Sequence, residues 1–273
     1  MNTVNLNIGG FDFSIRSENS KIIDLIRKGF KSFVSKGKNR EIKIEIVCAD
    51  SFRQANPYIY GNPHKTSIFK QNDRLYIQGG VYRGYFNEKK SYGEIRQGIS
   101  IQPTYLFLRN LLSIYMPEKN GFMLHAATIL SGKKAYIFTG RPQAGKSTIA
   151  KLSAADNRVV LSDDFSMIKK IDDIFYAFAS PFWGHVETGD KLINRYFPIH
   201  SLYFIRQDTV SYKKSITTKD AFKGLLRNIC FLGYNGLISD KILELSHDFV
   251  KNIPAHYLHF APDKQFWRCI EDE

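Results

Sequence analysis

Cysteine is scarce in this chain, with only Cys48, Cys230 and Cys269, far apart and odd in number. Such spacing provides neither a disulfide framework nor a zinc knuckle, so we expect a reducing, cytoplasmic setting. Long apolar runs are also missing: no stretch approaches the ~18 residues that a membrane span needs. The opening "MNTVNLNIGGFDFSI" alternates without the apolar core of a signal peptide. We therefore expect no membrane partner.

Acidic residues are outnumbered, with 26 Asp and Glu against 39 Lys and Arg, which leaves a formal charge of +13. This balance favours acidic partners such as nucleotides, nucleic acid, anionic lipid or an acidic peptide. Nucleic acid is the disfavoured choice, because the aromatic residues are dispersed through apparent strands and form no stacking motif. A hydrophobic content of 43% excludes a largely disordered chain.

Residues 1–104 are expected to form a smaller α+β domain. Residues 3–15 alternate like a strand, and residues 19–35 place apolar side chains at helical spacing behind a capping Asn or Ser. "REIKIEIVCA" is typical of a strand with period two, and the Gly- and Asn-punctuated aromatic segments of residues 65–102 indicate antiparallel hairpins.

Residues 105–273 are expected to form a second, α/β domain, entered through an apolar helix over residues 104–116. Two strands joined by the turn "SGKK" come next, and the second strand runs directly into a glycine-rich loop. Beyond the loop we expect a buried strand, a hairpin through "IDD", a strand at "SLYFIRQ", two helices, a strand at "AHYLHFAP" and a last helix. No internal repeat or low-complexity segment is present.

The stretch "YIFTGRPQAGKSTIAKLSA" (residues 136–154) matches G-x-x-x-x-G-K-[ST] between an apolar strand and a helix. In such a loop, backbone amides and the helix N-terminus surround phosphate oxygens, the Lys reaches the outer phosphates and the Ser hydroxyl reaches Mg²⁺. We therefore predict ATP and Mg²⁺ as ligands, with GTP left open. The expected nucleotide-binding residues are Gly140, Arg141, Pro142, Gln143, Ala144, Gly145, Lys146, Ser147 and Thr148.

The residues bear on two alternatives to an active loop of this kind. Gln143 stands where many such loops carry Gly, so a loop that keeps its shape and binds nothing is one alternative. Other loop-bearing classes lack their signatures here: the chain has no "LSGGQ"-like segment of an ABC-type ATPase and no "NKxD"-like guanine reader of a GTPase.

The acidic pair Asp163–Asp164 in "VVLSDDFSMI" is expected at the end of a strand, where ligands of open parallel sheets bind. Neighbouring strand residues point to opposite faces, so one carboxylate can hold the metal and the other can accept a proton. We assign the metal to Asp163, together with Ser147, and the base to Asp164. An acidic turn without function is the alternative, and the second pair, Asp172–Asp173, is interpreted as such a solvated turn.

Other candidates carry weaker signals. His125 lies on the strand before the loop and is, by chemistry alone, more often a core residue. Glu187 is interpreted as a surface loop acid. Arg195, Arg206 and Arg227 could each stabilise transferring charge, and spacing selects none of them.

Six segments in this order resemble the HPr kinase/phosphorylase group of the phosphoenolpyruvate-carboxykinase-like fold, especially its diverged members in bacterial peptide-biosynthesis clusters. They are "HAATIL", "GRPQAGKST", "LSDDFSMI", "SPFWGHVE", "PIHSLYFIRQ" and "PAHYLHFAPDKQFWRCIED". The resemblance covers residues 105–273 and implies a P-loop kinase core with a hydroxyl acceptor, commonly a serine. It makes His125, Lys146, Asp163 and Asp164 the catalytic residues.

The family's glycine-rich pattern with Glu and Arg, through which HPr kinases hold their protein substrate, does not align with residues 180–190, so HPr is not expected as the acceptor. We expect a kinase that phosphorylates a serine of a peptide or small protein, such as a lasso-peptide precursor, gripped by residues 1–104. A kinase of a free metabolite such as serine and a non-catalytic nucleotide-binding regulator are the alternatives. A homo-oligomer stays open.

Overall fold

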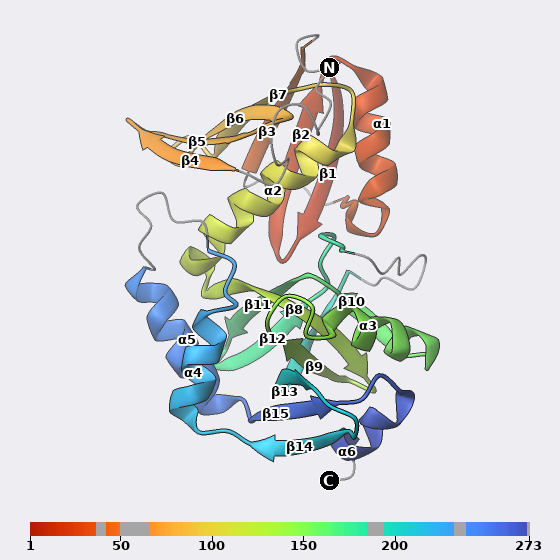
Figure 1. The fold of residues 1–273 in the computed structure, drawn as a ribbon. Helices are drawn as coiled ribbons and strands as arrows, with labels where there is room; N and C mark the ends of the chain where they lie inside the picture. The colour runs from red at the N-terminus through yellow and green to blue at the C-terminus, as the bar shows by residue number, and fades with distance from the viewer. Residues whose placement is uncertain (37–41, 50–65, 185–193, 232–238, 272–273) are drawn as a thin grey trace. The chain divides into compact units, whose positions relative to one another are not determined.

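The computed structural model describes residues 1–36, 42–49, 66–184, 194–231 and 239–271 (Figure 1). These residues form two β-sheets and six α-helices, a mixed α/β content. Contacts divide them into two compact units: residues 1–114, and residues 115–231 with 239–271. Each unit is described by itself.

The first unit is a seven-stranded sheet with two α-helices and one short 3-10 helix. Its strands follow the order β1-β2-β3-β7-β6-β5-β4, with β3 parallel to both of its neighbours and the other pairs antiparallel. The elements are β1 (Asn2–Ile8), β2 (Phe11–Ser17), α1 (Ser20–Gly29), η1 (Lys31–Phe33), β3 (Ile42–Cys48), β4 (Ser67–Gln71), β5 (Arg74–Gly79), β6 (Tyr82–Asn87), β7 (Tyr92–Gln97) and α2 (Ile101–Tyr115).

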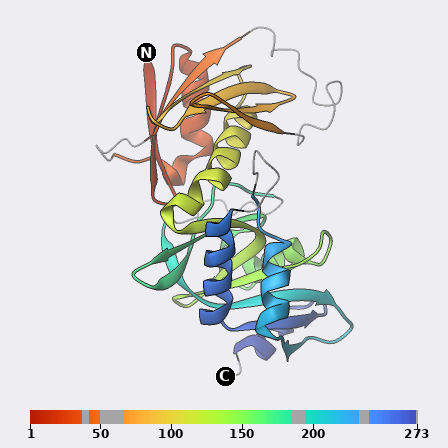
Figure 2. The same cartoon turned by 90° about the vertical axis from the view of Figure 1, so that its left-hand side faces the viewer.

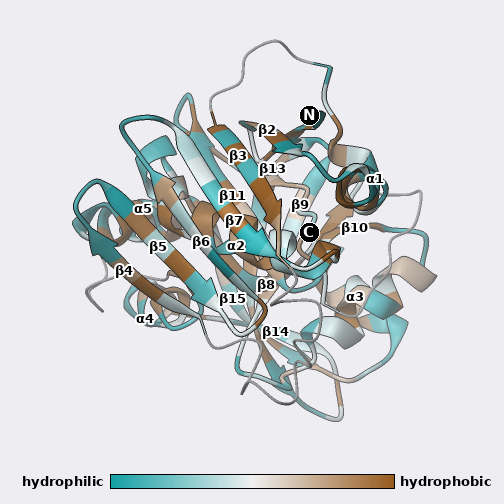
Figure 3. Cartoon of the chain, turned by 90° about the horizontal axis from the view of Figure 1, so that it is seen from above, coloured by the Kyte–Doolittle hydropathy of each residue, from teal (hydrophilic) through white to brown (hydrophobic). Residues whose placement is uncertain are grey.

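Buried residues alternate with more exposed ones along β1, β3, β5 and β7, as the period of two predicts, whereas β4 at the edge of the sheet has no buried residue. Figure 3 shows hydrophilic and hydrophobic bands along β4 and β5. Helix α1 begins where Asn19 accepts hydrogen bonds from the amides of Lys21 and Ile22. The helix was expected to reach residue 35 but ends at Gly29, and the chain continues as the 3-10 turn η1. Leu25, expected in the apolar stripe, is 39% exposed.

Helix α2 belongs to the first unit, so the unit boundary follows Ile114, ten residues after the expected boundary at residue 104. The physical reason is packing: the Phe107 ring meets the Tyr82 ring edge-on at 6.2 Å, and Thr104 donates a hydrogen bond to Gln97. This most apolar helix has 15 residues, fewer than the about 20 that cross a bilayer. Among the described residues, no helix is long and apolar enough to span a membrane.

The second unit is built on an eight-stranded sheet. Helices α4 and α5 lie side by side in it (Figure 2), with the Phe222 and His247 rings 6.0 Å apart. The elements are η3 (Met116–Lys119), β8 (Gly121–Ser131), β9 (Lys134–Thr139), α3 (Lys146–Ala155), β10 (Val159–Ser162), β11 (Phe165–Ile171), β12 (Ile174–Phe178), β13 (Tyr196–Gln207), β14 (Tyr212–Ser215), α4 (Thr218–Leu226), α5 (Asp240–Asn252), β15 (Ala255–Phe260), η5 (Lys264–Trp267) and α6 (Arg268–Glu271).

Two long strands hold this sheet together by changing partners along their length. The first half of β8 pairs with β11, whereas its second half pairs with β9 and β10. In the same way, β13 pairs first with β12 and later with β9 and β15. Strands β9, β13 and β15 are parallel, and β10 runs in the same direction as β9 because both are antiparallel to β8. The sheet of the second unit is therefore mixed, with both parallel and antiparallel pairs.

An aromatic core supports strand β9, which carries the chain into the glycine-rich loop. The Phe138 ring stacks on Tyr203 at 5.3 Å and meets Phe266 and Trp267 edge-on. The indole of Trp267 also donates a hydrogen bond to Ser153 of α3. The 3-10 helix η5, which carries Phe266 and Trp267, thus contacts both elements that flank the loop, β9 and α3.

Most of the element order expected from the sequence is confirmed. The hairpins of β4 to β7, the strands β8 and β9 around the turn at Gly132, and the turn at Asp172–Asp173 lie where the sequence predicts them. Strand β14 was missed because its four residues carry no clear alternation. Helix α4 ends at Leu226, earlier than expected, because the next residues pair with β8: Ile229 forms a bridge with Leu124.

Candidate functional site

The glycine-rich loop links β9 to α3 in the order that a phosphate-binding loop requires. Gly145 caps the helix with a φ of +116°, a conformation that side-chain-bearing residues rarely adopt. A Cβ at Gly140 would lie 3.1 Å from the Cβ of Ala144 and 3.3 Å from the carbonyl oxygen of Ile205. Glycine is therefore favoured at residue 145 by the backbone conformation and at residue 140 by the close approach of neighbouring atoms.

Gln143 takes the left-handed conformation, with a φ of +65°, where many such loops have glycine. The Gln207 side-chain amide donates a hydrogen bond of 2.8 Å to the Gln143 carbonyl oxygen. This contact from the carboxyl end of β13 supports the less favourable backbone conformation. A glutamine at this position thus does not prevent the loop from turning.

Lys146 begins helix α3 and is folded back under the loop. Its ammonium donates hydrogen bonds of 3.0 Å and 3.1 Å to the carbonyl oxygens of Gly140 and Arg141, and the residue is only 6% exposed. Burial lowers the pKa of Lys146 below its usual value, against smaller raising effects of the charges on Asp164 and Cys230. The lysine side chain thus lies in a position of low dielectric, where the attraction between an ammonium and an anion is screened less than at the surface.

The two acids occupy different environments. Asp163 follows β10 and is 2% exposed, and one of its carboxylate oxygens accepts a hydrogen bond of 2.8 Å from the Gly184 amide. Asp164 is partly exposed, and its carboxylate lies 2.8 Å from Nδ1 of His125. The side chains of consecutive residues thus meet different partners.

His125 reaches Asp164 because of the partner change in β8. Opposite His125, the neighbour of β8 changes from β10 to β11, and the Ala126 amide donates to the Asp164 carbonyl oxygen at 3.0 Å. The His125 amide donates on its other side to the Asn228 carbonyl oxygen. The backbone around His125 is therefore held by hydrogen bonds on both sides. Its half-buried ring lies beside Asp164, so His125 belongs to the site.

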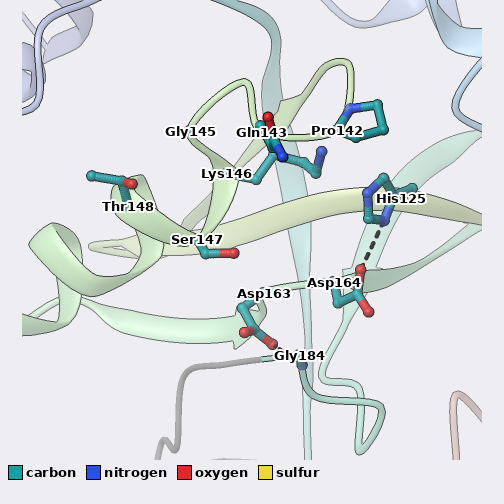
Figure 4. Close-up of a pocket in the computed structure, with 10 residues that line it drawn as sticks. All are labelled: His125, Pro142, Gln143, Gly145, Lys146, Ser147, Thr148, Asp163, Asp164 and Gly184. Carbon is teal, nitrogen blue, oxygen red and sulfur yellow. Dashed lines mark hydrogen bonds and ion pairs between the residues drawn. The ribbon is translucent and has the colours of Figure 1, made fainter.

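These residues surround one cavity of about 300 Å³ (Figure 4). Loop residues line one side of it, and the acids with His125 line the other. The lining residues are His125, Pro142, Gln143, Gly145, Lys146, Ser147, Thr148, Asp163, Asp164 and Gly184. The volume lies at the lower end of the range typical of small-molecule sites.

Three of the expected loop residues do not line the cavity. Gly140 and Arg141 contribute the carbonyl oxygens that hold Lys146, and Ala144 packs against the aromatic core. Their role in the described structure is to shape the loop.

A metal site made only of protein side chains is absent from the described residues, which contain no group of three His, Cys, Asp or Glu side chains that could hold an ion. The Ser147 hydroxyl and the Asp163 carboxylate line the same cavity and offer hard oxygen ligands. Mg²⁺ fits such a set, because it is commonly held by one or two carboxylates together with substrate phosphates.

The arginine candidates are not part of the cavity. Arg206 lies over the Tyr257 ring at 3.8 Å, Arg227 caps the end of α4, and the Arg195 carbonyl oxygen accepts a hydrogen bond from the Ala179 amide. None of them lines the cavity in the described part of the chain. Glu187 lies outside the described residues.

Sequence reasoning missed two residues of this site, Gly184 and Gln207. Gly184 in "SPFWGHVE" carries no motif of its own, and Gln207 is one polar residue at the end of a strand. Only the pairing of distant segments places Gly184 against Asp163 and Gln207 against Gln143.

Comparisons with known proteins add little to this geometry. No family model matches the chain, and no curated protein matches it. One solved structure that resembles it is the Hpr(Ser) kinase/phosphatase from Coxiella burnetii, at 15% identity and a TM-score of 0.24, over 48% of this chain and 88% of that chain. At that TM-score the likeness does not establish a common fold, so the case for a function depends on the residues of the cavity.

Proposed function

We propose that the chain is an ATP-dependent phosphotransferase that moves the γ-phosphoryl group of ATP to a hydroxyl, most specifically to a serine of a peptide or small protein. The single observation that carries the proposal is the shared cavity, with the buried Lys146 on one side and the His125–Asp164 pair on the other. A cation for phosphate and a carboxylate for a hydroxyl proton then face the same space.

The loop supplies the phosphate side of the site. The amides of the loop and of the first turn of α3 surround the phosphates, and Lys146 leaves the carbonyl oxygens of Gly140 and Arg141 to meet the outer ones. Because the ammonium is buried, its attraction to phosphate is screened less than that of a surface lysine.

Ser147 and Asp163 would hold Mg²⁺ next to these phosphates. When bound, the ion neutralises charge on the phosphate oxygens during transfer. Asp163 is suited to this role because it is buried and its carboxylate is held by the Gly184 amide.

Asp164 supplies the acceptor side. Its carboxylate accepts the proton of the incoming hydroxyl, whose oxygen forms a bond to the γ-phosphorus as the bond to the β-phosphate oxygen breaks and ADP leaves. His125 holds the carboxylate from the side and orients it. Simple nucleotide binding does not need a carboxylate oriented in this way, which argues against a non-catalytic regulator.

The proposed acceptor class rests on the charge of the chain and on the presence of the first unit in addition to the unit that carries the cavity. A net charge of +13 favours an acidic acceptor, and the first unit offers a separate body that can bind one. A free metabolite such as serine would need neither feature.

The test is to incubate the full chain with Mg²⁺, with ATP labelled in its γ-phosphate, and either with serine-containing acidic peptides or with free serine. Label in a peptide, located on serine by mass spectrometry, supports the proposal. Label in free serine alone would replace the peptide by a metabolite. No label in any acceptor, with ATP bound, would contradict the kinase assignment.

A further inference from the structure

Gly184 contacts both acids of the cavity from a segment far along the chain. Its amide donates a hydrogen bond of 2.8 Å to Oδ1 of Asp163, which lies 21 residues earlier. The segment before it is anchored: the Ser180 amide donates to the Leu161 carbonyl oxygen, and Phe182 is fully buried. The position of the Gly184 amide is therefore set by the body of the unit.

The absence of a side chain at Gly184 matters for space and not for backbone conformation. Gly184 is not among the glycines with a left-handed φ in the described residues, so an alanine could adopt its backbone angles. An added Cβ, however, would lie 3.2 Å from Oδ2 of Asp163 and 3.1 Å from Cβ of Asp164. Contacts this short force neighbouring atoms to move by a few tenths of an ångström.

An added Cβ would crowd both acids of the cavity. Oδ1 of Asp163 accepts the hydrogen bond from the Gly184 amide, and Oδ2 of the same carboxylate would lie 3.2 Å from the new Cβ. Asp164, the proposed base, would be crowded at its own Cβ, while its carboxylate is paired with His125. The missing side chain of Gly184 thus leaves room for both acids in the positions that the structure shows.

We propose that Gly184 is a positioning residue for the Asp163–Asp164 pair. Its amide orients the Asp163 carboxylate, and its missing side chain leaves room for both acids. This inference rests on the proposed function, since it assigns the pair to metal and proton transfer. Gly184 itself touches neither substrate nor metal in this scheme, and it acts through Asp163.

The test uses Gly184→Ala in the full chain, with a non-hydrolysable ATP analogue as the ligand and calorimetry with and without Mg²⁺. We expect Mg²⁺ to strengthen analogue binding to the wild type. In Gly184→Ala this Mg²⁺-dependent gain in affinity should fall by about 10- to 100-fold, while the affinity without Mg²⁺ is unchanged. A loss of that size is typical when a group that orients a metal ligand is removed.

A matched control separates positioning from a loss of stability. Gly132→Ala adds the same methyl group in the β8–β9 turn, where no atom lies within 4 Å of the new Cβ. This variant should keep the Mg²⁺-dependent gain. In the Asp163→Asn background, Gly184→Ala should add little further loss, because both changes act through one carboxylate.

A second measurement does not depend on the folding of Gly184→Ala. Hydrogen exchange at the Gly184 amide should be slow in the wild type and faster in Asp163→Ala, which removes the acceptor. Three results would each overturn the inference. They are an unchanged exchange rate at the Gly184 amide in Asp163→Ala, additive losses of affinity in the double variant, and a full Mg²⁺-dependent gain in affinity in Gly184→Ala. If the wild type binds no nucleotide, the proposed function falls first and the inference with it.

Discussion

The chain contains two Asp-Asp pairs, Asp163–Asp164 and Asp172–Asp173, at the two ends of the same strand, β11. The first pair is drawn into the cavity, where each acid has its own partner. The second pair forms the tight turn between β11 and β12, with φ angles of +46° and +64°. Two identical dipeptides, separated only by the seven residues of β11, thus lie in different surroundings.

The surroundings of the two pairs explain the difference. Asp163 is 2% exposed and faces a backbone amide, whereas Asp173 is solvent-exposed and forms an ion pair of 2.9 Å with Lys170. The second pair also lines a cavity, of about 490 Å³, together with Lys170, Lys241, Glu244 and Asp248. Lys170 already bonds Asp173 and Asp248 there, so its charge is taken up by the protein.

The groups that surround a carboxylate pair therefore decide what chemistry it can take part in. The Asp163–Asp164 pair shares a cavity with the glycine-rich loop and the buried Lys146. The turn pair faces solvent and a surface lysine, in an arrangement whose net stabilisation is small.

The largest expected effect separates the two pairs directly. Asp164→Asn should lower phosphoryl transfer by roughly 10²- to 10⁴-fold while nucleotide binding is kept, because the proposed general base would be lost. Asp172→Asn should leave the rate unchanged, since asparagine tolerates the left-handed turn. Single-turnover transfer with labelled ATP measures both, and equal rates for the two variants would erase the distinction between the pairs.

Lys146→Ala tests the cation that faces the first pair. Transfer should fall by about 10²- to 10³-fold, and ATP binding should weaken, because a buried charge on the outer phosphates is lost. Lys151→Ala, an exposed change on the same helix α3, is the matched control. Normal turnover in Lys146→Ala would remove the phosphate role and leave the first pair without its partner.

Gly145→Ala tests the loop backbone. Its φ of +116° is costly for alanine, and the new Cβ would lie 3.2 Å from the Phe260 ring. A strain of about 1–3 kcal/mol predicts nucleotide binding weakened by about 5- to 150-fold, measured by calorimetry. Gly132→Ala again provides a control at a positive φ with open space, and tight binding in Gly145→Ala would show that the loop adapts.

The smallest effect is expected at the turn pair. The hydrogen bond with Lys170 lowers the pKa of Asp173, whereas the pKa of Lys170 is raised first by its hydrogen bond with Asp248 and then by that with Asp173. A lowered carboxyl pKa stabilises the fold above the ordinary value of 3.8 and loses this effect as pH falls through the folded value. Asp173→Asn should shift the unfolding midpoint by at most about two degrees at pH 7, with the difference vanishing in acid or high salt.

Thermal denaturation of the wild type and Asp173→Asn, at neutral and at acid pH, measures the unfolding midpoints. A large shift at pH 7 would mean that the turn pair matters to the fold more than a surface ion pair can explain.

The elements with strong local signals could be predicted from the sequence. The strand-loop-helix order around Gly140 to Ser147 and the hairpins punctuated by Gly and Asn depend on neighbours along the chain, so they were readable. The unit boundary was not, because the place of α2 depends on long-range contacts such as that between Phe107 and Tyr82.

Within the candidate site, the residue types could be predicted and most partners could not. Asp163, Asp164 and Lys146 carry recognisable chemistry, and His125 was assigned through a resemblance. The contacts of Gly184 with Asp163 and of Gln207 with Gln143 have no local signal, because the chain folds back over long separations to make them.

By itself, the sequence determined the turn chemistry of the loop, the strand-ending acids and the charge excess, since each depends on residues adjacent in the chain. Tertiary structure alone decided which of two identical Asp pairs lines the cavity with the glycine-rich loop, which partner each acid receives and that Gly184 lies against the first pair. The physical reason is that burial and hydrogen-bond partners depend on strand pairing, and β8 sets that pairing by changing neighbours at His125.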